Sequence, residues 1–196
     1  MKQGLRRERR NALRIGLAVV GLAGFLSMLA GGWIYIKAGI AKVLLRSAWE
    51  QTLAGAEQVR PWPWADLHPL ARLTVPSLHA EEIVLSGASG PTLAFGPGHV
   101  AHTGEPGGRG NCVIAGHRDT SFRFLKDLKP GDEIRITDRR GAESVYTVSS
   151  SKIVDESETW VMSQGLEGTL TLITCYPFDD PLPGPRRYVV FARMEG

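Results

Sequence analysis

The chain divides into three stretches by the way its apolar and polar residues alternate. Residues 15–36 form an uncharged run, IGLAVVGLAGFLSMLAGGWIYI. Residues 37–60 carry apolar positions near helical spacing, and beyond Pro69 short β-prone runs alternate with glycine- and proline-rich turns. This pattern predicts an apolar helix, a helical spacer and a body made of strands.

The uncharged run is long enough to cross a membrane. Its 22 residues would extend about 33 Å as a helix, against roughly 30 Å of hydrocarbon. Trp33 and Tyr35 lie at its far end, where aromatic rings favour the membrane interface. A cleaved signal peptide would have a shorter apolar region with small residues before its cleavage site, but Met28 stands two positions before Ala30 and the run continues. We therefore expect an uncleaved transmembrane signal anchor over 15–36.

The distribution of charge orients this anchor. Residues 1–14 hold six basic side chains and one acid, and residues 37–46 hold three basic side chains and no acid, within a chain of net charge +3. The rest of the chain is therefore acidic, which argues against a nucleic-acid partner. A basic cluster ahead of an apolar run predicts a cytoplasmic tail over 1–14. We expect a single-pass protein of the plasma (inner) membrane with its body on the extracytoplasmic, periplasmic side.

A proline-rich segment, RPWPWADLHP, separates the spacer from the body. Because three prolines in ten residues break a helix, we place the boundary there, with a helical stalk over 37–60 and one domain over 61–196. Trp62 and Trp64 are interpreted as packing residues at the start of this domain, with a membrane-surface or ligand role as the alternative.

The body has the pattern of a mainly β protein. A hairpin is expected around Arg140–Gly141, and SFRFLKDL (121–128) is the one stretch with helical character. Eight short strands in one domain favour a closed or nearly closed barrel. The candidate strands are 72–78, 81–86, 92–98, 110–117, 132–138, 143–154, 169–176 and 187–193.

Three polar residues stand at the ends of these strands. His117 ends VIAGH, Cys175 ends TLITC, and Arg187 begins RYVVFA, with Arg186 beside it. A thiolate is a strong nucleophile, a histidine can exchange protons with it, and a guanidinium can hold a developing oxyanion. Each residue alone also has an ordinary structural interpretation, as a small core residue, a turn residue or a solvated cation. Together they could perform acyl transfer.

These segments give the chain a resemblance to the sortases, which are membrane-anchored cysteine transpeptidases. The resemblance rests on GNCVIAGHRDTSFRFL, on TLTLITCYPF, which matches the sortase T-L-x-T-C pattern, and on PRRYVVFAR. It covers nearly the whole chain, from anchor to catalytic domain. The segments RPWPWADLHPLARLTVPSL and LAFGPGHV resemble the proteobacterial branch, class GN.

The resemblance implies an eight-stranded sortase β-barrel with short helices and a two-step reaction. Cys175 would attack an LPXTG-like C-terminal sorting signal of a protein substrate and form a thioester. His117 would exchange protons with the leaving and incoming amines, and Arg187, rather than Arg186, would bind substrate and steady the oxyanion. An amine acceptor, which the sequence does not identify, would resolve the thioester and attach the surface protein to the cell envelope. Thr174 is a further substrate-binding candidate, or it satisfies a strand end.

Other residues leave alternatives open. Cys112 is expected to pack in the core, with a catalytic or disulfide role as the alternative. Asp119 either orients His117 or is neutralised by its neighbour. His99 and His102 fall in a glycine-rich loop where turn chemistry is the expected role, and we predict no metal and no cofactor.

Two other functions fit the same residues. A cell-envelope cysteine hydrolase or peptidase would use the same Cys–His pair without transfer to an amine. A non-catalytic, membrane-tethered β-domain would use neither. An L,D-transpeptidase fits poorly, since the Ser-His-Gly-Cys context is absent around Cys175.

Overall fold

The computed structural model describes residues 2–165, 167–180, 182 and 184–195. It contains two compact units, one ending at Ala41 and the other beginning at Lys42. The second unit starts before the proline-rich boundary expected near 61, because the last turns of the long helix have apolar contacts of their own. Leu45 on these turns is buried in a cluster with Leu67 and Leu85.

Helix α1 (Lys2–Leu53) includes residues 15–36, for which a transmembrane helix is expected. Over the part of the chain that the structure describes, no helix combines the length and the apolar character needed to span a membrane. The helix ends sooner than the helical spacing suggests. Gly55 has a φ of +96°, a left-handed conformation that commonly terminates helices, and its amide donates to the Thr52 carbonyl.

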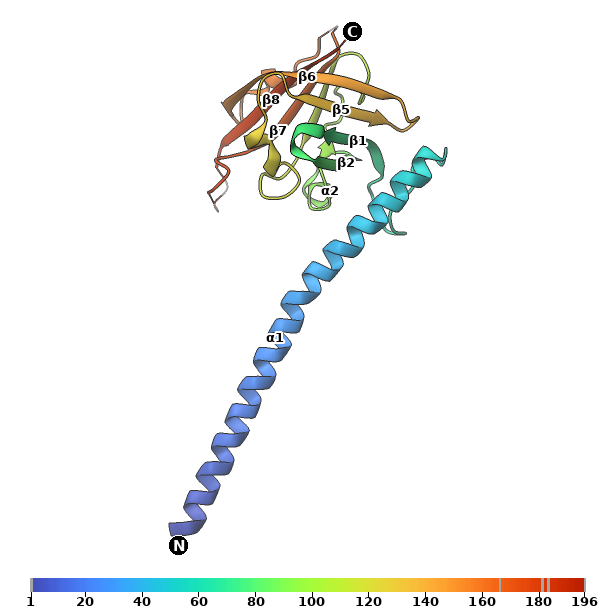
Figure 1. The fold of residues 1–196 in the computed structure, drawn as a ribbon. Helices are drawn as coiled ribbons and strands as arrows, with labels where there is room; N and C mark the ends of the chain where they lie inside the picture. The colour runs from blue at the N-terminus through green and yellow to red at the C-terminus, as the bar shows by residue number, and fades with distance from the viewer. Residues whose placement is uncertain (1, 166, 181, 183, 196) are drawn as a thin grey trace. The chain divides into compact units, whose positions relative to one another are not determined.

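The eight strands form a closed barrel, which confirms the predicted fold (Figure 1). Around the barrel the order is β1-β2-β3-β4-β7-β8-β6-β5. The strands are β1 (Pro69–Val75), β2 (Ala80–Ser86), β3 (Gly98–His99), β4 (Asn111–Ala115), β5 (Glu133–Asp138), β6 (Glu143–Asp155), β7 (Thr169–Tyr176) and β8 (Arg186–Met194). Most neighbours are antiparallel, but β2–β3 and β4–β7 are parallel.

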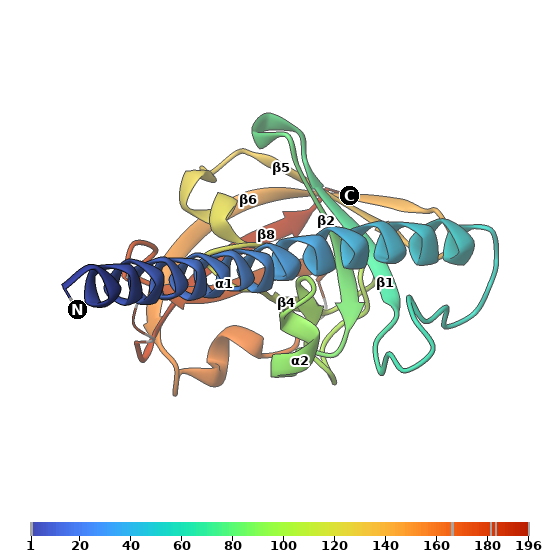
Figure 2. The same cartoon turned by 90° about the horizontal axis from the view of Figure 1, so that it is seen from below.

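Four short helices connect the strands: η1 (Pro76–Leu78), α2 (Gly90–Leu93), η2 (Arg123–Asp127) and η3 (Thr159–Met162). Figure 2 shows η1 at the tip of the β1–β2 hairpin. The expected helix over 121–128 is present as η2, a 3₁₀ helix. The expected hairpin around Arg140–Gly141 joins β5 to β6.

The strand expected over 92–98 is wrong. Its first two residues belong to α2, where Pro91 stands in the first turn and supplies the φ angle of a helix. Only Gly98 and His99 pair as a strand, between β2 and β4. A β-carbon at position 98 would lie 2.1 Å from the Gly87 carbonyl oxygen, so the close approach of these strands requires glycine there.

Side chains alternate between the barrel interior and its outer wall. The main core fills the interior and includes Ile114 of β4, Leu172 of β7 and Val190 of β8. A smaller cluster on the outer wall contains Val189 of β8, with Ile173 of β7 packed against it. This alternation decides which strand-end residues can meet outside the barrel.

Candidate active site

The three residues singled out at strand ends meet across neighbouring strands. Cys175 of β7 and Arg187 of β8 are direct partners in the antiparallel ladder. On the other side of β7, the Gly116 amide extends the parallel β4–β7 ladder by donating to the Ile173 carbonyl over 3.0 Å. His117 follows Gly116 immediately, so it lies at the end of this ladder on the side of β7 opposite to Arg187. We call these three residues the His–Cys–Arg row; the ribbons of β7 and β8 that carry two of them lie together in Figure 1.

The row belongs to the outer wall of the barrel. Leu172 in β7 and Val190 in β8 point into the main core. Side chains an odd number of positions apart on one strand point to opposite faces. Cys175 is three positions from Leu172 and Arg187 is three positions from Val190, so both point out of the barrel. His117 lies just beyond the end of β4, and its side chain is exposed. A substrate could therefore reach all three from solvent.

Gly116 and a tight turn position His117. A β-carbon at Gly116 would come within 2.8 Å of the Phe122 ring, so a larger residue would push the core against the strand end. After the turn, the Phe122 amide donates to the His117 carbonyl over 2.9 Å. The His117 side chain is exposed, which leaves its imidazole available to exchange protons with a bound substrate.

The two cysteines occupy different environments, and neither is in a disulfide. Cys112 lies in the main core, and burial, with a smaller contribution from the Glu105 carboxylate, raises its pKa to about 12. Such a thiol is inert at neutral pH, which confirms the packing role expected for it. Cys175 is half-buried on the outer wall and is the thiol that a peptide could approach.

The Arg187 guanidinium is held in place by three partners. It donates from Nη1 to the Gly184 carbonyl at 2.8 Å and to the Arg186 carbonyl at 3.0 Å, and its Nη2 pairs with Glu156 at 2.6 Å. Its side chain is 28% exposed. Arg186 instead lies over the Tyr176 ring, 5.2 Å from the centroid. Of the two arginines, the ladder therefore sets Arg187 opposite Cys175.

Thr174 does not share the outer face of the row. Its side chain is buried, and Oγ1 donates to the Gly116 carbonyl over 2.7 Å. The hydroxyl ties the end of β7 to the residue before His117. This geometry favours the strand-end role over direct substrate binding.

The other open residues have structural partners. Asp119 lies 3.5 Å from the Arg118 Nε, which favours neutralisation by its neighbour over orientation of His117. His99 is buried, with Nε2 2.8 Å from the Gly104 carbonyl oxygen, and His102 has a positive φ, as turn residues often do. Within the described ranges, no three His, Cys, Asp or Glu side chains form a group that could hold a metal.

Sequence reasoning missed Arg118, which it considered only as a neutralising neighbour. The side chain is buried, and its guanidinium donates to three backbone carbonyls in the segment between β7 and β8. Its place immediately after His117 was the available signal, but the partners lie some sixty positions further along the chain and become neighbours only in the barrel.

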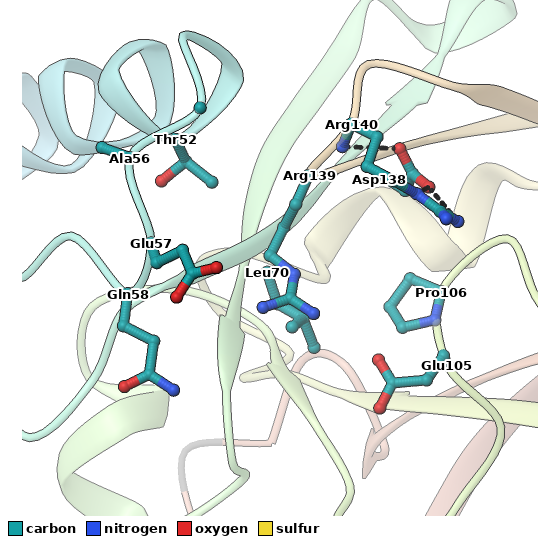
Figure 3. A pocket seen from close by; sticks show the side chains of 11 residues that line it. Thr52, Ala56, Glu57, Gln58, Leu70, Glu105, Pro106, Asp138, Arg139 and Arg140 are labelled. Carbon is teal, nitrogen blue, oxygen red and sulfur yellow. Dashed lines mark hydrogen bonds and ion pairs between the residues drawn. The ribbon is translucent and has the colours of Figure 1, made fainter.

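A cavity of about 680 Å³ lies away from the His–Cys–Arg row. Residues from the α1 end, the β5–β6 turn and the segment before β4 line it, whereas the row lies where β4 ends. Figure 3 shows Arg139 extending into this cavity between the carboxylates of Glu57 and Glu105. Since no residue of the row lines it, its size does not mark the reactive site.

A cysteine and an arginine paired on a closed barrel, with an exposed histidine at the end of the adjoining strand, are the residue types that acyl transfer requires. The Sortase domain family model matches residues 73–195, more than half of the chain. This chain belongs to the sortase family.

Individual relatives agree with this assignment. The chain is 34% identical to Sortase D of Bacillus subtilis over 122 residues, 62% of this chain and 61% of that protein. It is 32% identical to Sortase A of Listeria monocytogenes over 127 residues, 63% of this chain and 55% of that protein. Each match thus spans less than two thirds of the relative's length.

Solved structures share the fold. Listeria monocytogenes sortase A superposes with a TM-score of 0.59 and 28% identity, over 65% of this chain and 88% of that one. The Clostridium perfringens Sortase D5 transpeptidase gives a TM-score of 0.63 and 26% identity, over 81% of this chain and 99% of that one.

Proposed function

We propose that this chain is a cysteine transpeptidase that cleaves an LPXTG-like sorting signal and transfers the acyl group to an amine. The observation that supports this proposal is the pairing of Cys175 with Arg187 across β7 and β8, with His117 just beyond the end of the adjoining strand β4. Family membership and the resemblance of the motifs support the substrate class. Assignment to the proteobacterial branch is part of the proposal.

The reaction follows from the chemistry of the row. The Cys175 thiolate attacks the carbonyl carbon of the Thr–Gly bond of the signal, and the Arg187 guanidinium stabilises the negative oxygen. His117 protonates the leaving amine, the C–N bond breaks, and an acyl thioester remains. An acceptor amine then attacks the thioester, His117 takes its proton, and a new amide forms as the Cys175 thiolate leaves.

Apolar residues beside the row suggest where the signal lies. Ile173 and Val189 continue the outer face of β7 and β8 next to the row, and Val161 of η3 packs with them. Val189 and Val161 are already buried, whereas Ile173 is half-buried. A leucine- and proline-containing peptide in extended form would bury apolar surface against Ile173, which stabilises binding by about 25 cal/mol per Å².

We also propose that the chain is held in the plasma (inner) membrane by residues 15–36, with its N-terminus cytoplasmic and its catalytic unit extracytoplasmic. The uncharged run and the basic residues before it support this topology. Protease protection tests it: spheroplasts treated with protease should lose the barrel, and an epitope at the N-terminus should be cut only after lysis.

A transfer assay distinguishes the candidate functions. Purified full-length chain is mixed with an LPXTG-containing peptide and an amine, and products are identified by mass spectrometry. Transpeptidation yields the new amide, and Cys175→Ala abolishes it, while Cys112→Ala is the matched control that keeps it. Cleavage without an amide product would favour the hydrolase. No cleavage and no trapped thioester, with peptides of varied sorting motif, would favour the non-catalytic domain.

A further inference from the structure

Arg118 occupies an unusual position for a charged residue. It follows His117 directly, and its side chain is only 6% exposed. Burial of a cation is costly unless hydrogen-bond acceptors replace the lost water. The hydrogen-bond partners of Arg118 therefore indicate which part of the fold it stabilises.

Three acceptors lie in the segment that joins β7 to β8. Nη1 donates to the Pro177 carbonyl over 2.8 Å, and Nη2 donates to the Leu182 carbonyl over 2.9 Å and to that of Asp180. The segment begins just after Cys175 and ends just before Arg187. The Arg118 guanidinium thus binds the segment that joins Cys175 to Arg187. Arg118 is itself the residue next to His117, the third member of the His–Cys–Arg row.

The geometry suits arginine in particular. A planar guanidinium offers several N–H groups in fixed directions, whereas a lysine ammonium is a compact donor on a flexible stem. The Asp119 carboxylate, 3.5 Å from Nε, balances part of the charge. The Nη1 and Nη2 groups of Arg118 donate to backbone carbonyls of the β7–β8 segment. A side-chain substitution in that segment would leave these acceptors in place.

We propose that Arg118 is a positioning residue, which fixes the β7–β8 segment against the end of β4 and so holds Arg187 and Cys175 in register with His117. This inference rests on the proposed function for the roles of the row. Arg118 touches none of the reacting atoms in this proposal; it acts through the segment that it binds.

The test uses the full-length chain in detergent micelles with Arg118→Lys and Arg118→Met. Arg123, exposed and only five positions along, supplies the matched control Arg123→Met, because no hydrogen bond to its side chain is found in the described structure. In both Arg118 variants we expect the ¹⁵N order parameters of Phe178, Asp180 and Leu182 to fall from about 0.85 to below about 0.6.

Kinetics supply the second readout. Misplacement of reacting groups by about 1 Å can lower rates about 100-fold. We therefore expect kcat for peptide cleavage to fall at least ten-fold with KM changed less than three-fold, and Arg123→Met to match wild type in both. Unchanged order parameters in Arg118→Lys would overturn the proposal, as would an unchanged kcat.

The order parameters and the kinetics test the role of Arg118 and the proposed function separately. If the wild-type chain neither cleaves nor transfers, the proposed function fails, while the order parameters still decide whether Arg118 fixes the segment. If Arg118→Met does not fold, Arg118→Lys keeps the charge and carries both measurements.

Discussion

Cys175 and Arg187 are direct partners across the β7–β8 ladder, although a connecting segment separates them in the chain. This pairing sets the thiol and the guanidinium on one outer face, a strand's width apart.

Alkylation will distinguish the two cysteines. Cys112 is 1% exposed and its pKa is raised to about 12 by burial, so almost none of it is thiolate at neutral pH. We expect iodoacetamide to label Cys175 at least about ten times faster, as measured by peptide mass spectrometry at pH 7. Comparable rates in the folded chain would contradict the burial of Cys112.

Removal of Arg187 will affect catalysis more than removal of Arg186. Loss of a group that stabilises an oxyanion typically lowers kcat about 10²–10³-fold, and we expect this for Arg187→Ala. Arg186→Ala, which loses only its contact over the Tyr176 ring, is the control and should stay within about three-fold. Steady-state cleavage of a sorting peptide measures both. Equal losses would reassign the role.

An alanine at Gly116 will disturb the His117 position. Its β-carbon would meet the Phe122 ring at 2.8 Å, so we expect a loss of about 1–3 kcal/mol in the free energy of unfolding and a fall in activity. Gly90→Ala is the matched control, because a β-carbon there has no neighbour within 4 Å. Urea denaturation of both variants, with peptide cleavage, gives the comparison; a Gly116→Ala protein as stable as wild type would contradict the close packing.

Replacement of the Thr174 hydroxyl will tell its two roles apart. Thr174→Val leaves the buried Gly116 carbonyl without this donor, and we expect a cost of about 1–3 kcal/mol in unfolding free energy. Thr174→Ser keeps a donor and should recover most of it. A strand-end role predicts little change in KM for Thr174→Val, whereas a large rise in KM that Thr174→Ser restores would revive direct substrate binding.

Glu82 will make stability depend on pH. Burial raises its pKa from 4.5 to about 7, against the opposing effect of Lys42 and Arg46. The folded state therefore favours the protonated carboxyl. The contribution of Glu82 to the free energy of unfolding is fully present below about pH 4.5 and is lost as pH rises through about 7. At 1.36 kcal/mol per pKa unit the loss is at most about 3 kcal/mol.

Glu82→Gln isolates that contribution. The amide cannot ionise, so the free energy of unfolding of the variant should fall less between pH 5 and pH 7.5 than that of wild type. Glu81→Gln, at the exposed neighbouring position, removes a charge that helps to raise the pKa of Glu82, so its curve should lie between those of wild type and Glu82→Gln. Parallel curves for Glu82→Gln and wild type would show that Glu82 ionises normally in the folded chain.

The strand pattern and the candidate nucleophile can be predicted from local sequence. Alternation of apolar residues depends only on neighbours along the chain, so most strand positions, including β6 and β7, are predictable. It failed at 92–98, where proximity of Gly98 to Gly87 limits pairing to two residues. That contact joins separate strands and has no local signature.

The assembly of the site depends on contacts between strands that are distant in the chain. The barrel sets β4, β7 and β8 side by side; the β7–β8 register pairs Cys175 with Arg187, and His117 follows the end of β4 on the other side of β7. The same arrangement buries Thr174 and directs Arg118 at carbonyls beyond β7. Local sequence supplies the reactive side chains, but pairing between distant strands fixes their directions, because each strand's register is set by partners that the chain reaches only on folding.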